Sequence, residues 1–119
     1  MNRLISTGSV IVDLPLTMPH LPQRGGDVLG SADAPTPGGG FNVVAAAARQ
    51  GAHVALLSPL GDGPQGRLCV DALGTEGIHL LLDPVPGIDT GLCVTVTEPD
   101  GERTFLTAAG AETTLTAAQ

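Results

Sequence analysis

The chain has 119 residues, of which 42% are hydrophobic but only two are aromatic, so its core must be built from aliphatic side chains. Twelve acidic residues stand against five basic residues, giving a formal net charge of −7, and the arginines are scattered along the chain. Nucleic-acid binding needs a concentrated positive face and anionic membranes attract basic segments, so we expect neither partner.

Cysteine usage and the apolar pattern indicate where the protein works. Cys69 and Cys93 lie in apolar stretches without a CxxC spacing, which is typical of small buried thiols. The first apolar run begins within a few residues of Met1, so we expect no signal peptide, and no apolar stretch is long enough to cross a bilayer. These features predict a cytoplasmic protein. The three histidines have no spacing typical of a metal site, so we expect no metal ligands.

The first predicted element is a buried strand over residues 4–13, because a β-favouring apolar run continues past Gly8 and ends near Asp13. Residues 14–36 contain four prolines and the pair Gly25-Gly26, a composition that disfavours a helix. We expect an excursion of short extended pieces there, one of them over residues 27–30.

Three consecutive glycines at 38–40 precede a short alanine-rich helix, which we expect over residues 42–50. Asn42 would cap the start of this helix and Gly51 would close it. Glycines remove side chains from the turn, so backbone N–H groups and the Asn42 amide can approach a polar ligand closely. The pattern predicts a binding loop.

The rest of the chain alternates strands and helices. We expect a buried strand over 53–58, a helix beginning at Pro64 and ending at Gly77, and a strand over 78–82. Segments 90–97 and 102–107 predict a hairpin around a turn at 98–101. The order predicts an α/β architecture on a largely parallel sheet, with a small β extension.

The last four residues allow two interpretations. Thr116 and Gln119 have the spacing of a capping box, which indicates that the chain stops where a helix begins. A frayed polar tail is the alternative.

Two generic phosphate-binding motifs fail on the glycine run. A Walker loop needs Gly-Lys-Ser/Thr, and no lysine follows residues 38–40. The dinucleotide fingerprint needs a third glycine where Val43 stands, and it comes directly after the first strand, whereas this run comes much later.

The combined motifs resemble the ribokinase-like (PfkB) carbohydrate kinases over essentially the whole chain. The first signature of that family is Gly-Gly-Gly-x-Asn at 38–42 with Gly51 and Gly61 at fixed distances, and Val44 departs from its usual Ser, Thr or Ala. Flanking matches are Gly8-Ser9 with Asp13, Gly61-Asp62 with Gly66, Glu76-Gly77-Ile78, Thr90-Gly91, the segment 100–104, and Ala109-Gly110-Ala111.

The resemblance implies a fold and a substrate site. Residues 1–119 would form a single, partial ribokinase-like domain, incomplete at the C-terminus, with a small β lid made of segments 14–36 and 90–108. In the family a sugar or nucleoside hydroxyl attacks the γ-phosphate of ATP. Asp13 would accept hydrogen bonds from the hydroxyls, the backbone at Gly39 and Gly40 would touch the sugar, and the Asn42 amide would donate and accept.

The resemblance also implies what this chain lacks. Family members are more than twice as long, and their second half carries Gly-Ala-Gly-Asp, whose Asp is the catalytic base, together with the ATP site. ATP and Mg²⁺ would serve the full-length protein, while we expect no catalytic, cofactor-binding or metal-binding residue here. Glu112 lies on the substrate side and would not be a base. We therefore expect no phosphorylation by the isolated chain.

Other interpretations remain open from the residues alone. Asp13 could merely cap a turn before Pro15, and Asn42 could act only as a helix N-cap. The chain could be a non-catalytic polyol-binding module, or it could associate through its lid, for example as a homodimer. A third possibility is a domain that folds only with a partner chain carrying the second half. The sequence does not identify which sugar or nucleoside binds.

Overall fold

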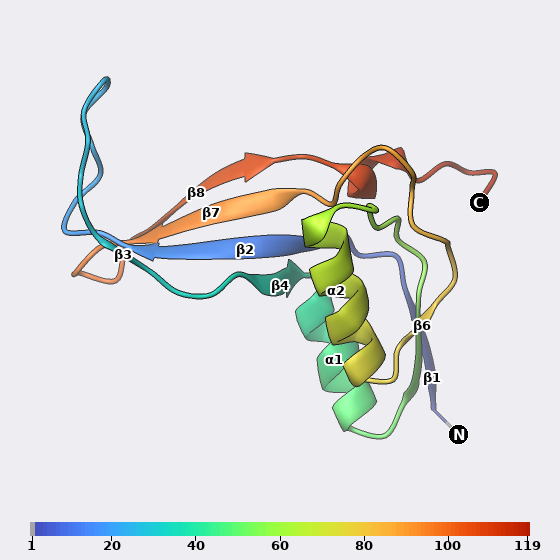
Figure 1. The fold of residues 1–119 in the computed structure, drawn as a ribbon. Helices are drawn as coiled ribbons and strands as arrows, with labels where there is room; N and C mark the ends of the chain where they lie inside the picture. Colours follow the sequence, from blue (N-terminus) through green and yellow to red (C-terminus); the bar gives the residue numbers. More distant parts are fainter. Residues whose placement is uncertain (1) are drawn as a thin grey trace.

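The first two strands belong to different sheets in the computed structural model, which describes residues 2–119 (Figure 1). Strand β1 spans Arg3–Ser6 and β2 spans Val10–Thr17, so the prediction of one strand over 4–13 was wrong. The chain turns at residues 7–9, where Gly8 packs against the backbone of Gly40 and the N–H of Gly40 donates to the carbonyl of Ser9 (2.7 Å). This tertiary contact separates two segments that look continuous in the sequence.

A parallel sheet of three strands carries both α-helices on one face (Figure 1). Its order is β1-β5-β6, with β5 at His53–Leu56 and β6 at His79–Leu80, so the strands expected over 53–58 and 78–82 exist but are shorter. Helix α1 spans Phe41–Arg49 and α2 spans Pro64–Thr75. Gly51 and Gly77 follow the helices with positive φ, as their positions predicted.

A second, mixed sheet extends away from the helices (Figure 1). Its strands β3 (Ser31–Ala32), β2, β7 (Leu92–Thr97) and β8 (Arg103–Ala108) lie in that order, and β4 (Thr36–Gly39) also pairs with β2. The β2–β7 pair is parallel and the others are antiparallel. The predicted hairpin is confirmed as β7–β8, whereas residues 27–30 form no strand and the short β3 follows them instead.

The core lies where the two helices pack against the parallel sheet and the start of β2, and it is aliphatic, as the composition requires. Its buried members are Val10, Val12, Val44, Val54, Leu56, Leu60, Cys69, Leu73 and Ile78. Both cysteines are buried free thiols, as predicted. Burial, followed by the negative charges of Asp89, Glu112 and Asp13, raises the pKa of the Cys69 thiol to about 12, so this thiol is unreactive at neutral pH.

The segment after β8 is short and tied to the body. Residues Ala111–Thr114 form a single 3₁₀ turn. Beyond it, the side chain of Gln119 accepts a hydrogen bond from the N–H of Thr116 (2.8 Å), one of the two bonds of the predicted capping box. Neither helix in residues 2–119 has the length and hydropathy that crossing a membrane requires.

Candidate functional site

Strands β2 and β4 bring Asp13 beside the glycine run. In their antiparallel register Asp13 faces Thr36 and Ile11 faces Gly38, so Asp13 lies diagonally across from Gly38 on the same face of the sheet. Gly38 is buried, and a Cβ built on it would overlap the Asp13 carboxylate. Glycine at 38 therefore makes room for that carboxylate.

The Asp13 carboxylate is half-buried and free. No protein hydrogen bond to it is found within residues 2–119. In register it forms a row across four strands with Thr36 on β4, Cys93 on β7 and Thr107 on β8. The Thr107 hydroxyl donates to the sulfur of Cys93 (3.3 Å), so this row is polar at both ends. A carboxylate without a partner on such a row can accept hydrogen bonds from a ligand.

The opposite face of the mixed sheet is apolar. Period-two alternation places Leu14, Leu16, Val94, Val96 and Leu106 there. Towards its far end this face is hollowed by about 430 Å³, and the loop residues Leu21, Pro22 and Val28 complete the walls. The two faces of one sheet thus differ in chemistry, and only the face that carries Asp13 suits a polyhydroxyl ligand.

The glycine run continues from β4 into α1. Gly39 has a φ of +61°, and a Cβ there would also meet the carbonyl oxygen of Ser9. Gly40 is the N-cap of α1 and provides no side-chain capping bond. Asn42 is the second residue of the helix, so the prediction that it caps the helix was wrong. The helix begins one residue earlier than expected, which leaves the exposed Asn42 amide without that capping role.

The four predicted site residues lie on neighbouring parts of the backbone, namely the paired strands β2 and β4 and the start of α1. Asp13 lies on β2, Gly39 pairs with Val10 of the same strand, and Gly40 and Asn42 follow directly. The N-terminus of α1, with its positive dipole end, therefore lies next to the Asp13 strand.

Two carboxylates that the sequence did not single out as important hold the neighbouring loops. Asp89 accepts hydrogen bonds from the N–H groups of Gln65, Gly66 and Thr90 (3.1, 2.8 and 2.8 Å). Burial acts to raise the pKa of Asp89, but the backbone donors outweigh it and hold this pKa below its usual value. Glu112 accepts hydrogen bonds from the N–H groups of Gly91 and Gly110 (both 2.8 Å).

Only one signal in the sequence pointed to Asp89. Pro64 begins α2 and Gly63 precedes it, so no local side chain caps that helix, and a distant acceptor is required. Nothing in the spacing says which of the acidic residues supplies it.

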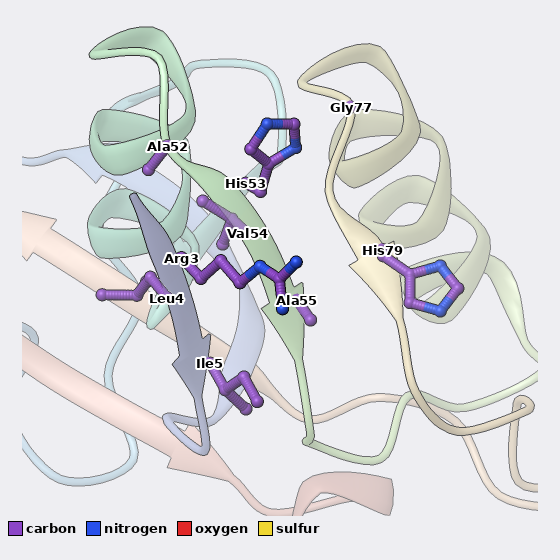
Figure 2. Close-up of a pocket in the computed structure, with 9 residues that line it drawn as sticks. All are labelled: Arg3, Leu4, Ile5, Ala52, His53, Val54, Ala55, Gly77 and His79. Atoms are coloured by element: carbon purple, nitrogen blue, oxygen red, sulfur yellow. The ribbon is translucent and has the colours of Figure 1, made fainter. Parts of the chain in front are cut away.

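A further hollow of about 350 Å³ lies on the face of the parallel sheet away from the helices (Figure 2). Arg3, His53 and His79 share this face with Ile5 and Ala55, because Arg3 pairs with His53 and Ala55 with His79. It contains none of the predicted site residues.

Two features of residues 2–119 bear on phosphate and metal binding. The N-terminus of α2, where a phosphate could sit, is already filled by the Asp89 carboxylate. Within residues 2–119 no three His, Cys, Asp or Glu side chains cluster as metal ligands.

Comparison with known proteins gives a consistent result. The family described as "pfkB family carbohydrate kinase" matches residues 1–119. The chain is 33% identical over 112 residues to the uncharacterized sugar kinase YegV of Escherichia coli, covering 93% of this chain and 35% of that protein. It is 31% identical over 120 residues to the ribokinase of Bacillus subtilis, covering 99% of this chain and 41% of that protein.

A solved structure agrees. The chain is similar to Arabidopsis thaliana ribokinase complexed with ribose and ATP, at 27% identity and a TM-score of 0.76, over 92% of this chain and 36% of that one. The chain thus spans well under half the length of the relatives that it matches.

Proposed function

Because the chain belongs to the pfkB family of carbohydrate kinases, we propose that it forms the sugar-binding part of an ATP-dependent kinase. The kinase would transfer the γ-phosphate to a hydroxyl of a sugar or nucleoside. Asp13, Gly39, Gly40 and Asn42 would contact that substrate. The likeness to ribokinases favours a pentose such as ribose, which is present in the Arabidopsis complex.

One observation carries this proposal. The Asp13 carboxylate lies against Gly38 with no protein partner within residues 2–119, while the half-buried carboxylates of Asp89 and Glu112 are hydrogen-bonded. Among the described residues no buried side-chain oxygen lacks a partner, so the Asp13 oxygens are open to solvent and available to a ligand that donates hydrogen bonds. Sugar hydroxyls are such donors.

Each residue would have a distinct task. Asp13 accepts hydrogen bonds from two neighbouring hydroxyls and so fixes the orientation of the ring. The side-chain-free turn at Gly39 and Gly40 lets the sugar approach the backbone. The exposed Asn42 amide both donates and accepts, which suits a hydroxyl group. The mixed sheet would serve as a lid that excludes water, since water competes with the hydroxyl for the phosphoryl group.

We further propose that the catalytic base and the ATP site lie outside residues 1–119. The supporting observation is that the half-buried carboxylates of Asp89 and Glu112 are held by backbone N–H groups, which leaves them poorly placed to take a proton from a hydroxyl. The 119-residue chain should show no ATP-dependent phosphorylation of ribose. Turnover by this chain alone would contradict the proposal.

The binding proposal is tested by titration calorimetry with D-ribose. Asp13→Asn should weaken binding at least about tenfold, because hydrogen bonds to a charged acceptor contribute about 1.5–3 kcal/mol. Asp33→Asn is the matched control, because Asp33 is an exposed acid in the segment 14–36 that follows Asp13 and should leave binding unchanged. Equal affinity of wild type and Asp13→Asn would overturn the assignment.

A second copy of the chain is the proposed partner of the apolar lid face. The hollow there is lined by Leu16, Val94, Val96 and Leu106, and Leu106 is 58% exposed. Sedimentation should show a dimer that Leu106→Lys dissociates. Leu29→Lys is the control, because Leu29 is more exposed but lies outside the hollow. A wild-type monomer would exclude this partner.

We also propose a cytoplasmic location, which the free buried cysteines support.

A further inference from the structure

The two ends of the β7–β8 hairpin meet at one place in the body of the protein. Residues 89–91 lead into β7 and lie against the loop 61–66 at the start of α2, and residues 110–112 follow β8 and lie against residues 89–91. We call these three segments the junction. The N–H of Ala111 donates to the carbonyl of Asp89 (2.9 Å), which ties the two ends of the hairpin to each other.

Asp89 ties the first end of the hairpin to α2. Its carboxylate accepts from the first-turn N–H groups of Gln65 and Gly66 and from its neighbour Thr90. The Thr90 hydroxyl in turn accepts from the N–H of Gly61 (2.9 Å). Free N–H groups at a helix start favour a negative charge, so this bond set is directional and strong.

Glu112 ties the second end to the first. Its two carboxylate oxygens accept separately from the N–H groups of Gly110 and Gly91, one on each side of the hairpin. The carbonyl of Gly91 then accepts from the N–H of Val12 (3.0 Å), the residue before Asp13. A chain of hydrogen bonds therefore runs from α2 through the hairpin ends to the candidate sugar-binding strand.

The segments of the junction pack closely, backbone against backbone. A Cβ at Gly61 would collide with the backbone of Asp89 and Thr90, and a Cβ at Gly110 would collide with that of Asp89 and Gly91. Side chains are therefore excluded from several positions, and the segments touch main chain to main chain. Such a contact allows few relative orientations of the hairpin.

We propose that Asp89 and Glu112 are positioning residues that set the orientation of the β7–β8 hairpin relative to α2, and hence of the mixed sheet in which β7 pairs with the strand of Asp13. This inference rests on the proposed sugar-binding function for its consequence, but the orientation itself can be measured without sugar. Neither carboxylate would touch the substrate. They would act by keeping the mixed sheet, with Asp13 on β2, in the orientation relative to the body in which it can bind a sugar.

The orientation is tested by the distance between two spin labels in the 119-residue chain. Labels at Asp71→Cys on α2 and Pro99→Cys in the hairpin turn report the hairpin relative to the body, since both sites are exposed while Cys69 and Cys93 are buried. In the Asp89→Asn/Glu112→Gln double variant we expect the distance distribution to broaden and shift. Matched controls are Asp83→Asn and Glu102→Gln, exposed acids whose side chains accept none of these bonds.

D-ribose titration gives the functional consequence. If the sugar-competent orientation is populated about a tenth of the time in the double variant, the apparent Kd rises about tenfold. An unchanged distance distribution in the folded double variant would overturn the positioning role. If wild type binds no ribose while the distribution still broadens, the positioning role stands and the sugar-binding proposal fails instead.

The single variant Glu112→Gln covers the case in which the double variant does not fold. It keeps one acceptor oxygen and places an amide N–H group against a backbone donor, so it should broaden the distribution less than the double variant. The same distribution as wild type in this variant would likewise contradict the role of Glu112. The single variant Asp89→Asn, which retains Glu112, should show only the part of the broadening that Asp89 prevents.

Discussion

Asp13 and Asp89 are both carboxylates set against a glycine-rich turn, yet their surroundings differ in one decisive respect. Asp13 lies over Gly38 and receives no hydrogen bond within residues 2–119, whereas Asp89 receives bonds from Gln65, Gly66 and Thr90. The same combination of residue types therefore serves two purposes. A carboxylate that accepts no hydrogen bond from a backbone N–H group remains available for a ligand. A carboxylate that accepts from three N–H groups is instead used in holding the fold.

The difference originates in the backbone, not in the acid. Gly38 is part of β4, where its side-chain-free face gives space to Asp13. Gln65 and Gly66 lie in the first turn of α2, where N–H groups have no partner within the helix. The strand β4 gives Asp13 space, and the start of α2 gives Asp89 hydrogen-bond donors. The neighbouring element therefore determines whether each carboxylate is free or hydrogen-bonded.

The largest effect should come from closing the space in the junction. A Cβ at Gly66 would overlap the carbonyl oxygen of Gly61, which is main chain and cannot rotate away. Gly66→Ala should destabilise the protein by about 3 kcal/mol or more in urea unfolding, since overpacking a rigid contact forces the backbone to move.

Gly74→Ala is the matched control in the same helix. Nothing lies within 4 Å of a Cβ at Gly74, so alanine should raise stability by about 0.5–1 kcal/mol through its helix propensity. If the two substitutions had equal effects, the junction would not be the tight contact described.

The next effect concerns the charge of Asp89. Asp89→Asn should cost about 2 kcal/mol at neutral pH, because the amide loses charge-assisted bonds. The pKa of Asp89 is lowered in the folded state, so its stabilisation is present above the usual value of 3.8 and is lost as pH falls through the lowered folded pKa. The wild type and the variant should therefore converge in stability in acid. A difference that stays constant as the pH falls well below 3.8 would contradict this.

A smaller effect on stability, with a large effect on binding, is expected at Gly38. Gly38→Ala places a methyl group where the Asp13 carboxylate lies, but the carboxylate is the end of a side chain and can rotate away. Stability should fall by about 1 kcal/mol, while D-ribose affinity should fall as far as in Asp13→Asn. Normal ribose binding by Gly38→Ala would show that Asp13 does not need this space.

The sequence predicted the elements whose signals are local. Pro64 marked the start of α2, Gly51 and Gly77 marked helix ends, and alternation around the 98–101 turn predicted the hairpin. The pairing of Asp13 with the glycine run was expected only through a family resemblance. The structure shows the physical reason, which is the β2–β4 register.

The features that the sequence did not predict depend on contacts between residues far apart in the chain. The break at Gly8 depends on packing against Gly40, which lies on another element. Asn42 was taken as a helix cap on residue type, but the helix starts at Phe41 and Gly40 precedes it. The bonds of Asp89 reach residues more than twenty positions earlier, and no spacing rule links them.

The smallest effect should come from Glu76, a carboxylate whose partner, the Arg49 side chain, is 66% exposed. It accepts from the guanidinium of Arg49, and that bond lowers the pKa of Glu76 even though the pair is at the surface. Water screens such a pair, so Glu76→Gln should change the unfolding midpoint far less than Asp89→Asn does, and added salt should reduce the difference further. If Asp89→Asn lowers stability more than Glu76→Gln does, then N–H donors at a helix start stabilise a carboxylate in this fold more than a side chain of opposite charge does. A Glu76 effect as large as that of Asp89 would reverse the comparison.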